Sequence, residues 1–161
     1  MCEILEKDVD AATENGASIS EVAEKDNSMF LKMCKRFKSK KTVWLAYVKY
    51  QLKMGNHEEA SNLLKRSLLS LPGYKHVEVV SKVAELEFEL GSPERGRTLF
   101  NALLAKNRKR LDLLFVFIDK EVKCQNIGGA RALFKGVVQP CSGSLNMKLN
   151  DKQMKSLFKK W

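Results

Sequence analysis

Lysine and arginine side chains cluster along this 161-residue sequence, and the chemistry they offer is anion binding. The densest cluster follows a helical stripe and enters a loop: Lys32, Lys35, Arg36, Lys38, Lys40 and Lys41. A second cluster lies further along: Lys106, Arg108, Lys109 and Arg110. A third, sparser group lies near the end: Lys148, Lys152, Lys155, Lys159 and Lys160. Such side chains contact phosphates without reading base sequence. The first two clusters are therefore our candidates for RNA or partner binding; the alternative is a solvated charged face, or cations favoured by helix dipoles.

The sequence holds little that could make or break covalent bonds. His57 and His76 have no nucleophile or ligand partner nearby in the sequence, and Glu58 and Glu59 stand in a first helical turn, where acids favour the helix dipole. The four cysteines follow no zinc-ligand spacing, and no glycine-rich loop could cradle a phosphate. We therefore expect a protein that is not an enzyme and that has no cofactor, metal or small-molecule substrate.

The net charge of +10 is unevenly distributed along the chain. Residues 1–28 carry eight acidic and two basic side chains, a charge of −6, which leaves +16 for residues 29–161. This shift predicts an acidic, flexible leader over residues 1–28 and a folded domain over residues 29–161. A charge of +16 favours an acidic partner such as nucleic acid or an acidic protein. No apolar run is long enough to span a membrane, and we expect no membrane partner.

Three segments of the chain resemble one another, at offsets of 36 and 34 residues. Each opens with apolar residues at the spacing i, i+3, i+4, i+8, which is typical of an amphipathic helix. These stripes are Trp44, Tyr47, Val48 and Leu52; Val80, Val83, Ala84 and Phe88; and Leu114, Phe117, Ile118 and Val122. A second helical stripe follows in each segment, with a small residue near its start that lets two helices approach closely: Ala60, Gly96 and Ala130.

The repeats predict an all-α fold, a right-handed α-solenoid of stacked helical hairpins. We expect full repeats over about 42–70, 76–106 and 111–139, and partial units over 29–38 and 151–161, with Asp151 capping the last helix. A non-repeating helical bundle is the alternative. Equivalent loops of stacked repeats share one edge, so the first two basic clusters are expected to form one basic stripe.

The aromatic side chains mostly lie on the packing stripes, so we do not expect them to stack on bases, with Tyr74 as the candidate exception. A terminal repeat normally has a polar outer face. Phe158 and Trp161 resemble the opening of a first helix without its partner, which predicts self-association through the C-terminal edge.

The second and third units also carry an acid near the end of the first stripe and a basic residue two positions before a Leu-Phe pair in the second. This pattern resembles the half-a-tetratricopeptide (HAT) repeat of RNA-processing proteins, a relative of the tetratricopeptide (TPR) repeat. The acid and the basic residue match at Glu87 with Arg97 and at Glu121 with Arg131, whereas the first unit departs with Gln51 and Ser61. The resemblance implies a structural ion pair, which we expect to reach across each hairpin.

The likeness extends to the residue sequences of several segments. They are Lys32-Met-Cys-Lys-Arg-Phe-Lys38, His76-Val-Glu-Val-Val80, Ala84-Glu-Leu-Glu-Phe88, Gly91-Ser-Pro-Glu-Arg-Gly-Arg97, Arg108-Lys-Arg-Leu-Asp112, Ile118-Asp-Lys-Glu121 and Leu157-Phe-Lys-Lys-Trp161. They are similar to the C-terminal region of the ribosomal RNA processing protein five family. Members carry N-terminal S1-type RNA-binding domains, absent from this sequence, before such a helical array.

The resemblance implies a non-enzymatic scaffold in ribosomal RNA processing and ribosome small-subunit assembly. Members of the family are nucleolar, so it also implies a place in the nucleus and nucleolus. The expected partners are pre-ribosomal RNA and ribosome assembly proteins. The alternative is a protein-only interaction adaptor that binds an acidic partner peptide and makes no direct contact with RNA.

Overall fold

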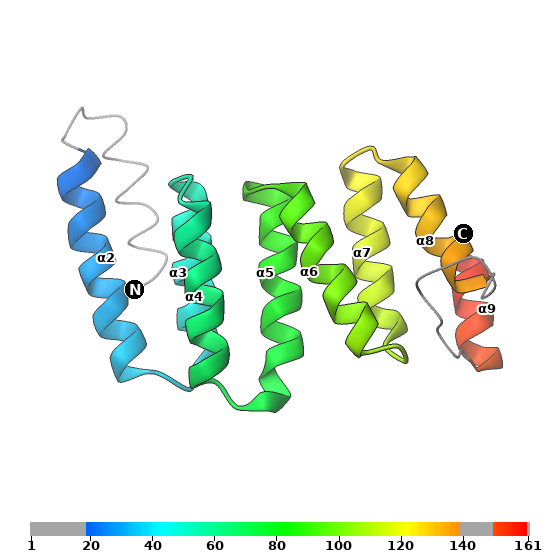
Figure 1. Ribbon diagram of the computed structural model, residues 1–161, viewed down its shortest axis with the longest axis horizontal. Coiled ribbons are helices and arrows are strands. Elements are labelled where there is room, and N and C mark those ends of the chain that lie inside the picture. The colour runs from blue at the N-terminus through cyan, green and yellow to red at the C-terminus, as the bar shows by residue number, and fades with distance from the viewer. Residues whose placement is uncertain (1–18, 139–149, 161) are drawn as a thin grey trace. The chain divides into compact units, whose positions relative to one another are not determined.

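The computed structural model describes residues 19–138 and 150–160, and every element in those ranges is helical (Figure 1). The elements are α2 (Ile19–Arg36), α3 (Lys41–Lys53), α4 (His57–Ser70), η1 (Gly73–Lys75), α5 (His76–Leu90), α6 (Pro93–Lys106), α7 (Leu111–Lys123), α8 (Ile127–Val138) and α9 (Asp151–Lys160). The helices follow one another in the order of the predicted hairpins, α3 then α4, α5 then α6 and α7 then α8, and the bounds of the repeats stay a prediction. The chain is an all-α helical-repeat protein, and the right-handed winding of the solenoid stays a prediction.

Aromatic stacking joins the second helix of one repeat to the first helix of the next. Phe30 of α2 stacks on Tyr47 of α3, with ring centroids 4.9 Å apart. Phe100 of α6 stacks on Phe117 of α7 in the same manner, with centroids 5.0 Å apart. The second pair lies 70 positions after the first, which is the sum of the two repeat offsets. The same aromatic contact therefore occurs at two repeat junctions, where it packs α3 against α2 and α7 against α6.

The chain divides into two compact units, residues 1–83 and 84–161, which we call the N-terminal unit and the C-terminal unit. The division falls inside α5, the first helix of the middle repeat. At the positions of this repeat that correspond to the stacked rings, the sequence has Leu64 and Val83. Neither side chain has a ring, so the junction between α4 and α5 lacks the stacked pair found between α2 and α3 and between α6 and α7.

The first described helix starts earlier than the sequence suggested. α2 begins at Ile19, so residue 28 lies inside a helix rather than at the junction expected from composition. Charged residues do not end a helix when they can project into solvent, whereas Gly and Pro do. Asp26 and Phe30 of α2 are both buried. Residues 1–18 of the predicted leader lie outside the described residues.

The last helix is capped one residue earlier than expected. Asn150 Oδ1 accepts a hydrogen bond of 2.8 Å from the backbone N–H of Gln153, and Gln153 Oε1 accepts one of 3.1 Å from the N–H of Asn150. This reciprocal pair is a capping box. Asn150 is therefore the cap, and Asp151, predicted for that role, is an exposed residue of the first turn.

Gly96 permits the closest helix approach within the middle hairpin. A Cβ atom at Gly96 would lie 2.5 Å from the Phe88 ring and 3.0 Å from the carbonyl oxygen of Ala84. The other two repeats have alanine at this position, and there the residue corresponding to Phe88 is the smaller Leu52 or Val122. The larger ring in the first helix is thus matched by the smaller residue in the second.

We predict opposite effects for two glycine-to-alanine changes. Gly96→Ala should lower the free energy of unfolding by about 1–3 kcal/mol, because the new methyl group overpacks against Phe88. Gly128→Ala, in the first turn of α8, should raise it by about 0.5–1 kcal/mol, because a Cβ there would have only one neighbour, 4.0 Å away. Urea unfolding followed by circular dichroism measures both, and equal effects would contradict the packing argument.

Candidate nucleic-acid interface

The first basic cluster lies at one end of the N-terminal unit, on the last turns of α2 and the turn into α3 (Figure 1). Five of its six cations are exposed, and none of the five is in an ion pair within the described part of the chain: Lys32, Lys35, Arg36, Lys38 and Lys40. Lys41 begins α3, is partly buried and pairs with Glu78 of α5. The sixth cation is therefore partly neutralised, while five face solvent.

The turn between α4 and α5 lies beside the turn between α2 and α3. Lys75 Nζ donates a hydrogen bond of 3.0 Å to the backbone carbonyl of Ser39. Trp44 Nε1 donates one of 2.9 Å to the carbonyl of Lys38, which anchors the same turn to α3. Lys75 was missed by the sequence reasoning. It follows Ser39 by one repeat offset, so comparison of equivalent loops could have found it.

Two exposed aromatic rings accompany these cations. Phe37 is 42% exposed and Tyr74 is 81% exposed. The guanidinium carbon of Arg36 lies 5.6 Å from the centroid of Phe37, and Lys75 Nζ lies 5.5 Å from that of Tyr74, both within cation–π range. We call the combined set the basic aromatic surface; its members are Lys35, Arg36, Phe37, Lys38, Lys40, Tyr74 and Lys75.

The second basic cluster belongs to the C-terminal unit, at the turn between α6 and α7. Lys106, Arg108 and Lys109 are exposed. Arg110 instead makes two hydrogen bonds to Asp112, of 2.8 and 2.6 Å. These bonds raise the pKa of Arg110 and lower that of Asp112. Three cations of this cluster thus remain for a partner.

The single basic stripe stays a prediction, because the two clusters belong to different units. In the third group, Lys152, Lys155 and Lys159 are exposed on α9. Lys148 and the side chain of Lys160 lie outside the described residues. Phe158 of the same helix is 61% exposed, and Trp161 is not described.

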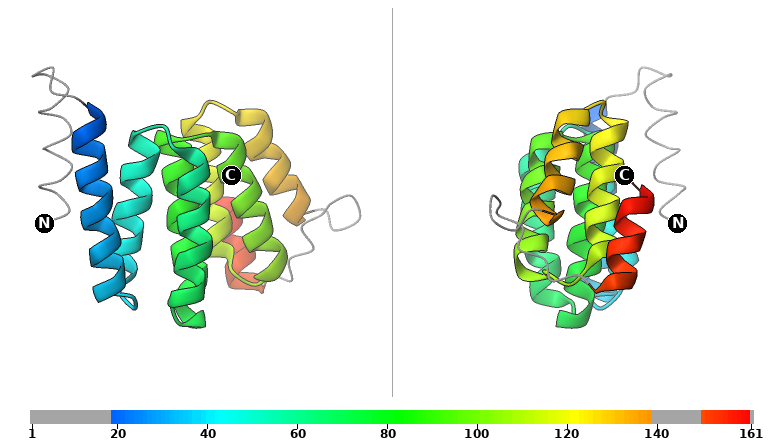
Figure 2. Two further views of the ribbon diagram at one scale, coloured as in Figure 1. Left: turned by 60° about the vertical axis from the view of Figure 1, so that its left-hand side comes forward. Right: turned by 90° about the vertical axis from the view of Figure 1, so that its right-hand side faces the viewer.

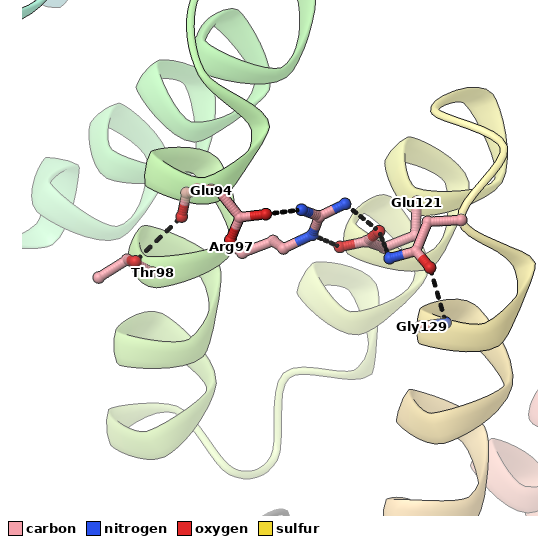
Figure 3. Close-up of polar contacts among 6 residues, drawn as sticks. Glu94, Arg97, Thr98, Glu121 and Gly129 are labelled. Carbon is pink, nitrogen blue, oxygen red and sulfur yellow. Dashed lines mark hydrogen bonds and ion pairs between the residues drawn. The ribbon is translucent and has the colours of Figure 1, made fainter.

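The repeat ion pair forms between repeats, which corrects the expectation that each arginine reaches across its own hairpin. Arg97 of α6 binds Glu121 of α7 through two hydrogen bonds, of 2.7 Å from Nε and 3.0 Å from the terminal nitrogen (Figure 3). These bonds raise the pKa of Arg97. Glu121 is 2% exposed, and Glu94 contacts the same guanidinium. The physical reason is the stacking of the repeats, which places the second helix of one repeat beside the first helix of the next. The helices α6 and α7 lie side by side in this way (Figures 1 and 2).

The N-terminal unit makes the same contact with neutral side chains. Gln51 Nε2 donates a hydrogen bond of 2.6 Å to Asn27 Oδ1. Asn27 and Gln51 lie 70 positions before Arg97 and Glu121. The departure at Gln51, visible in the sequence, is therefore matched by a departure at Asn27, and an amide pair takes the place of the ion pair.

The last arginine of the series faces an open groove. Arg131 is exposed and is in no ion pair within residues 19–138 and 150–160. It borders a cavity of about 640 Å³ between α7 and α8 whose lining includes Ile118, Val122, Ile127 and Phe134. Val122 and Ile127 are each about half exposed. The groove offers an apolar floor with Arg131 at its edge.

Two other kinds of site are absent from the described residues, a metal-binding cluster and a membrane-spanning helix. No group of three or more His, Cys, Asp or Glu side chains there could hold a metal ion. Among the described helices, none has the length and apolar character that crossing a membrane requires.

We predict that Arg97→Ala destabilises the protein by about 2 kcal/mol, because it leaves the buried Glu121 without its cation. Arg131→Ala is the matched control and should change the free energy of unfolding by less than about 0.5 kcal/mol. The double change Arg97→Asn with Glu121→Gln recreates the Asn27–Gln51 pair and should recover most of the loss. Urea denaturation measures all three; equal losses for the two alanine variants would refute the assignment.

The hydrogen bond from Lys41 lowers the pKa of Glu78 below its ordinary value. The pair therefore stabilises the fold above the unfolded-state pKa of Glu78, and this contribution is lost as the pH falls through the folded-state pKa. We predict that Lys41→Gln raises the pKa of Glu78 toward its ordinary value. Lys75→Gln, the control, should raise it less, because Lys75 acts on Glu78 only by weaker charge interaction. Carboxyl-carbon NMR titration distinguishes the two, and a greater rise in the control would contradict the pairing.

Comparison with known proteins places these features in a family. No family model matches the chain. The rRNA biogenesis protein rrp5 of Schizosaccharomyces pombe is 43% identical over 129 residues, which cover 80% of this chain and 7% of that protein. The human Protein RRP5 homolog is 32% identical over 142 residues, covering 88% of this chain and 7% of that protein.

A plant relative agrees with these two. The rRNA biogenesis protein RRP5 of Arabidopsis thaliana is 36% identical over 129 residues, which cover 80% of this chain and 6% of that protein. The chain thus spans less than a tenth of the length of the relatives it matches. Identity at this level over at least four fifths of the chain shows that it belongs to the RRP5 family of rRNA biogenesis proteins, matching one short segment of them.

Proposed function

We propose that the chain is a non-enzymatic helical-repeat scaffold in ribosomal RNA processing and small-subunit assembly. It contacts pre-ribosomal RNA through the first basic cluster and assembly proteins through the remaining surfaces. The observation that carries this proposal is the set of five exposed cations on the end of α2 and the turn that follows it, none of them in an ion pair within the described residues. The RRP5 relatives are named as rRNA biogenesis proteins, which supports ribosomal RNA as the kind of RNA bound. The corresponding location is the nucleus, concentrated in the nucleolus.

Electrostatics explains why this turn suits a phosphate backbone. Lys35 and Arg36 stand in the last turn of α2, and Lys38 and Lys40 follow directly, so their charges lie close together. Each phosphate neutralised on a single strand contributes about 0.7 to the slope of log affinity against log salt concentration. A patch of this kind therefore supplies affinity that weakens steeply with salt and carries little sequence preference.

The test is charge reversal at the centre of the cluster. Replacing Lys35, Arg36 and Lys38 together by Glu should abolish binding to a structured pre-ribosomal RNA fragment near physiological salt. Any binding left at low salt should have a salt slope smaller by about 2, as expected for three lost phosphate contacts. Fluorescence anisotropy across a salt series measures both quantities, and circular dichroism checks that the helices are retained.

A matched control separates the cluster from net charge. Lys65, Arg66 and Lys123 are also exposed, and replacing these three by Glu changes the net charge by the same amount. This control should keep most of the RNA affinity. If the two triple variants lose equal affinity, the first cluster is not the RNA site. If the wild-type chain binds no RNA even at low salt, direct RNA contact is excluded.

The groove between α7 and α8 supports a second candidate, a protein-only adaptor that binds an acidic peptide. At the preceding junction, Phe117 of α7 contacts the rings of Phe88 and Phe100, and Glu121 of α7 binds Arg97. The groove is lined by the residues that correspond to Phe88, Phe100 and Arg97 one repeat later, which are Val122, Phe134 and Arg131. It would accept a helix with an aromatic residue followed four positions later by a carboxylate. The exposed Phe158 supports self-association through the C-terminal edge as a further proposal.

A further inference from the structure

The exposed rings of the N-terminal unit are exceptions among its aromatic residues. Phe30, Trp44, Tyr47 and Tyr50 are each no more than 4% exposed and form the core between α2 and α3. Phe37 and Tyr74 instead project from turns and have no role in that core. Both rings stand among cations at the surface, a position from which they can contact a partner.

The two rings lie on neighbouring turns whose backbones are held in place. Lys40 N–H donates to the carbonyl of Phe37 at 3.0 Å, which closes the first turn. Lys75 N–H donates to the carbonyl of Pro72 at 2.9 Å, which closes the second. The bond from Lys75 Nζ to Ser39 links the two turns. Both rings are therefore presented at one end of the unit on a pre-organised support, which lowers the entropy lost on binding.

Each ring also has a cation over it, from Arg36 at Phe37 and from Lys75 at Tyr74. Tyr74 is 81% exposed, so the ring face opposite Lys75 can receive the flat face of a nucleobase, and Phe37, at 42% exposed, offers a smaller area. The same cations are within a side chain's reach of the phosphates that flank a stacked base. Aromatic rings combined with a positively charged surface are the means by which proteins hold single strands without sequence preference.

We propose that the basic aromatic surface binds unpaired RNA nucleotides, stacking bases on Tyr74 and Phe37 while Lys35, Lys38 and Lys40 contact phosphates. The inference rests on the proposed RNA contact and adds to it the strandedness of the RNA and the residues that hold the bases. Double-stranded RNA does not fit, because its base faces are already stacked within the helix. An acidic peptide fits less well, because the faces of aromatic rings carry partial negative charge and do not attract carboxylates.

Fluorescence anisotropy with three RNA probes of equal length tests the inference: an unstructured oligouridylate, an abasic oligomer with the same phosphate backbone, and a duplex. The wild-type chain should bind the oligouridylate most tightly. Tyr74→Ala and Phe37→Ala should each weaken that binding by about 5-fold to 100-fold, the range found when a stacking ring is removed. Neither variant should change the affinity for the abasic oligomer or the salt slope, because the charges remain.

Two control variants test whether the loss of binding comes from the loss of the ring itself rather than from the loss of any exposed apolar side chain. Tyr74→Trp keeps a stacking ring and should retain the wild-type affinity. Leu69→Ala removes a side chain that is 89% exposed but has no ring, and should leave binding unchanged. If the alanine variants bind the oligouridylate as the wild type does, or if the wild type binds abasic and base-carrying strands equally, stacking is excluded and the phosphate contact stands. If the wild type binds none of the probes at low salt, the proposed function fails as well.

Discussion

The helical hairpins depend on one buried hydrogen-bond acceptor near the end of each first helix. In each of the three repeats it accepts a hydrogen bond from the residue five positions later, which directly precedes the second helix. Gln51 Oε1 accepts from Asn56 at 2.9 Å, Glu87 Oε2 from the backbone of Ser92 at 3.1 Å, and Glu121 Oε2 from Asn126 at 2.7 Å. All three acceptors are at most 3% exposed, where an unsatisfied polar group would be costly. The bond therefore holds the chain reversal at the same five-residue interval in all three hairpins.

Two of these side chains also connect one repeat to the next. Glu121 accepts a hydrogen bond from Arg97, and Gln51 donates one to Asn27, so each of the two bonds to a turn on one side and to a preceding helix on the other. The stacked rings lie along the same junctions. With the junction between α2 and α3 fixed in this way, the turn between them is held rigidly at the edge of the unit. A binding surface benefits from such support, because its cations and rings need little reordering when a partner arrives.

Much of the fold could be predicted because the apolar spacing repeats in register. Trp44, Val80 and Leu114 lie near the starts of equivalent helices, and Gly55 and Gly91 follow the ends of the first two of them. The pairing of Arg97 was not predictable from one repeat alone, because a side chain at the edge of a hairpin can face either its own repeat or the next. The start of α2 was missed because a change in charge was taken for a change in structure, although charge alone does not break a helix.

The candidate site, like the fold, was predictable from the sequence in some respects and not in others. The sequence by itself determined that cations crowd residues 32–41, because charge is a property of residue type, and that repeats of helical hairpins would carry them. Only the tertiary structure decided that Lys41 is paired with Glu78, that Lys75 joins the cluster from another turn, and that Phe37 and Tyr74 stand exposed beside it. The physical reason is that exposure and pairing depend on which turns meet in space, and residues 36 positions apart in sequence meet only after the helices between them have packed.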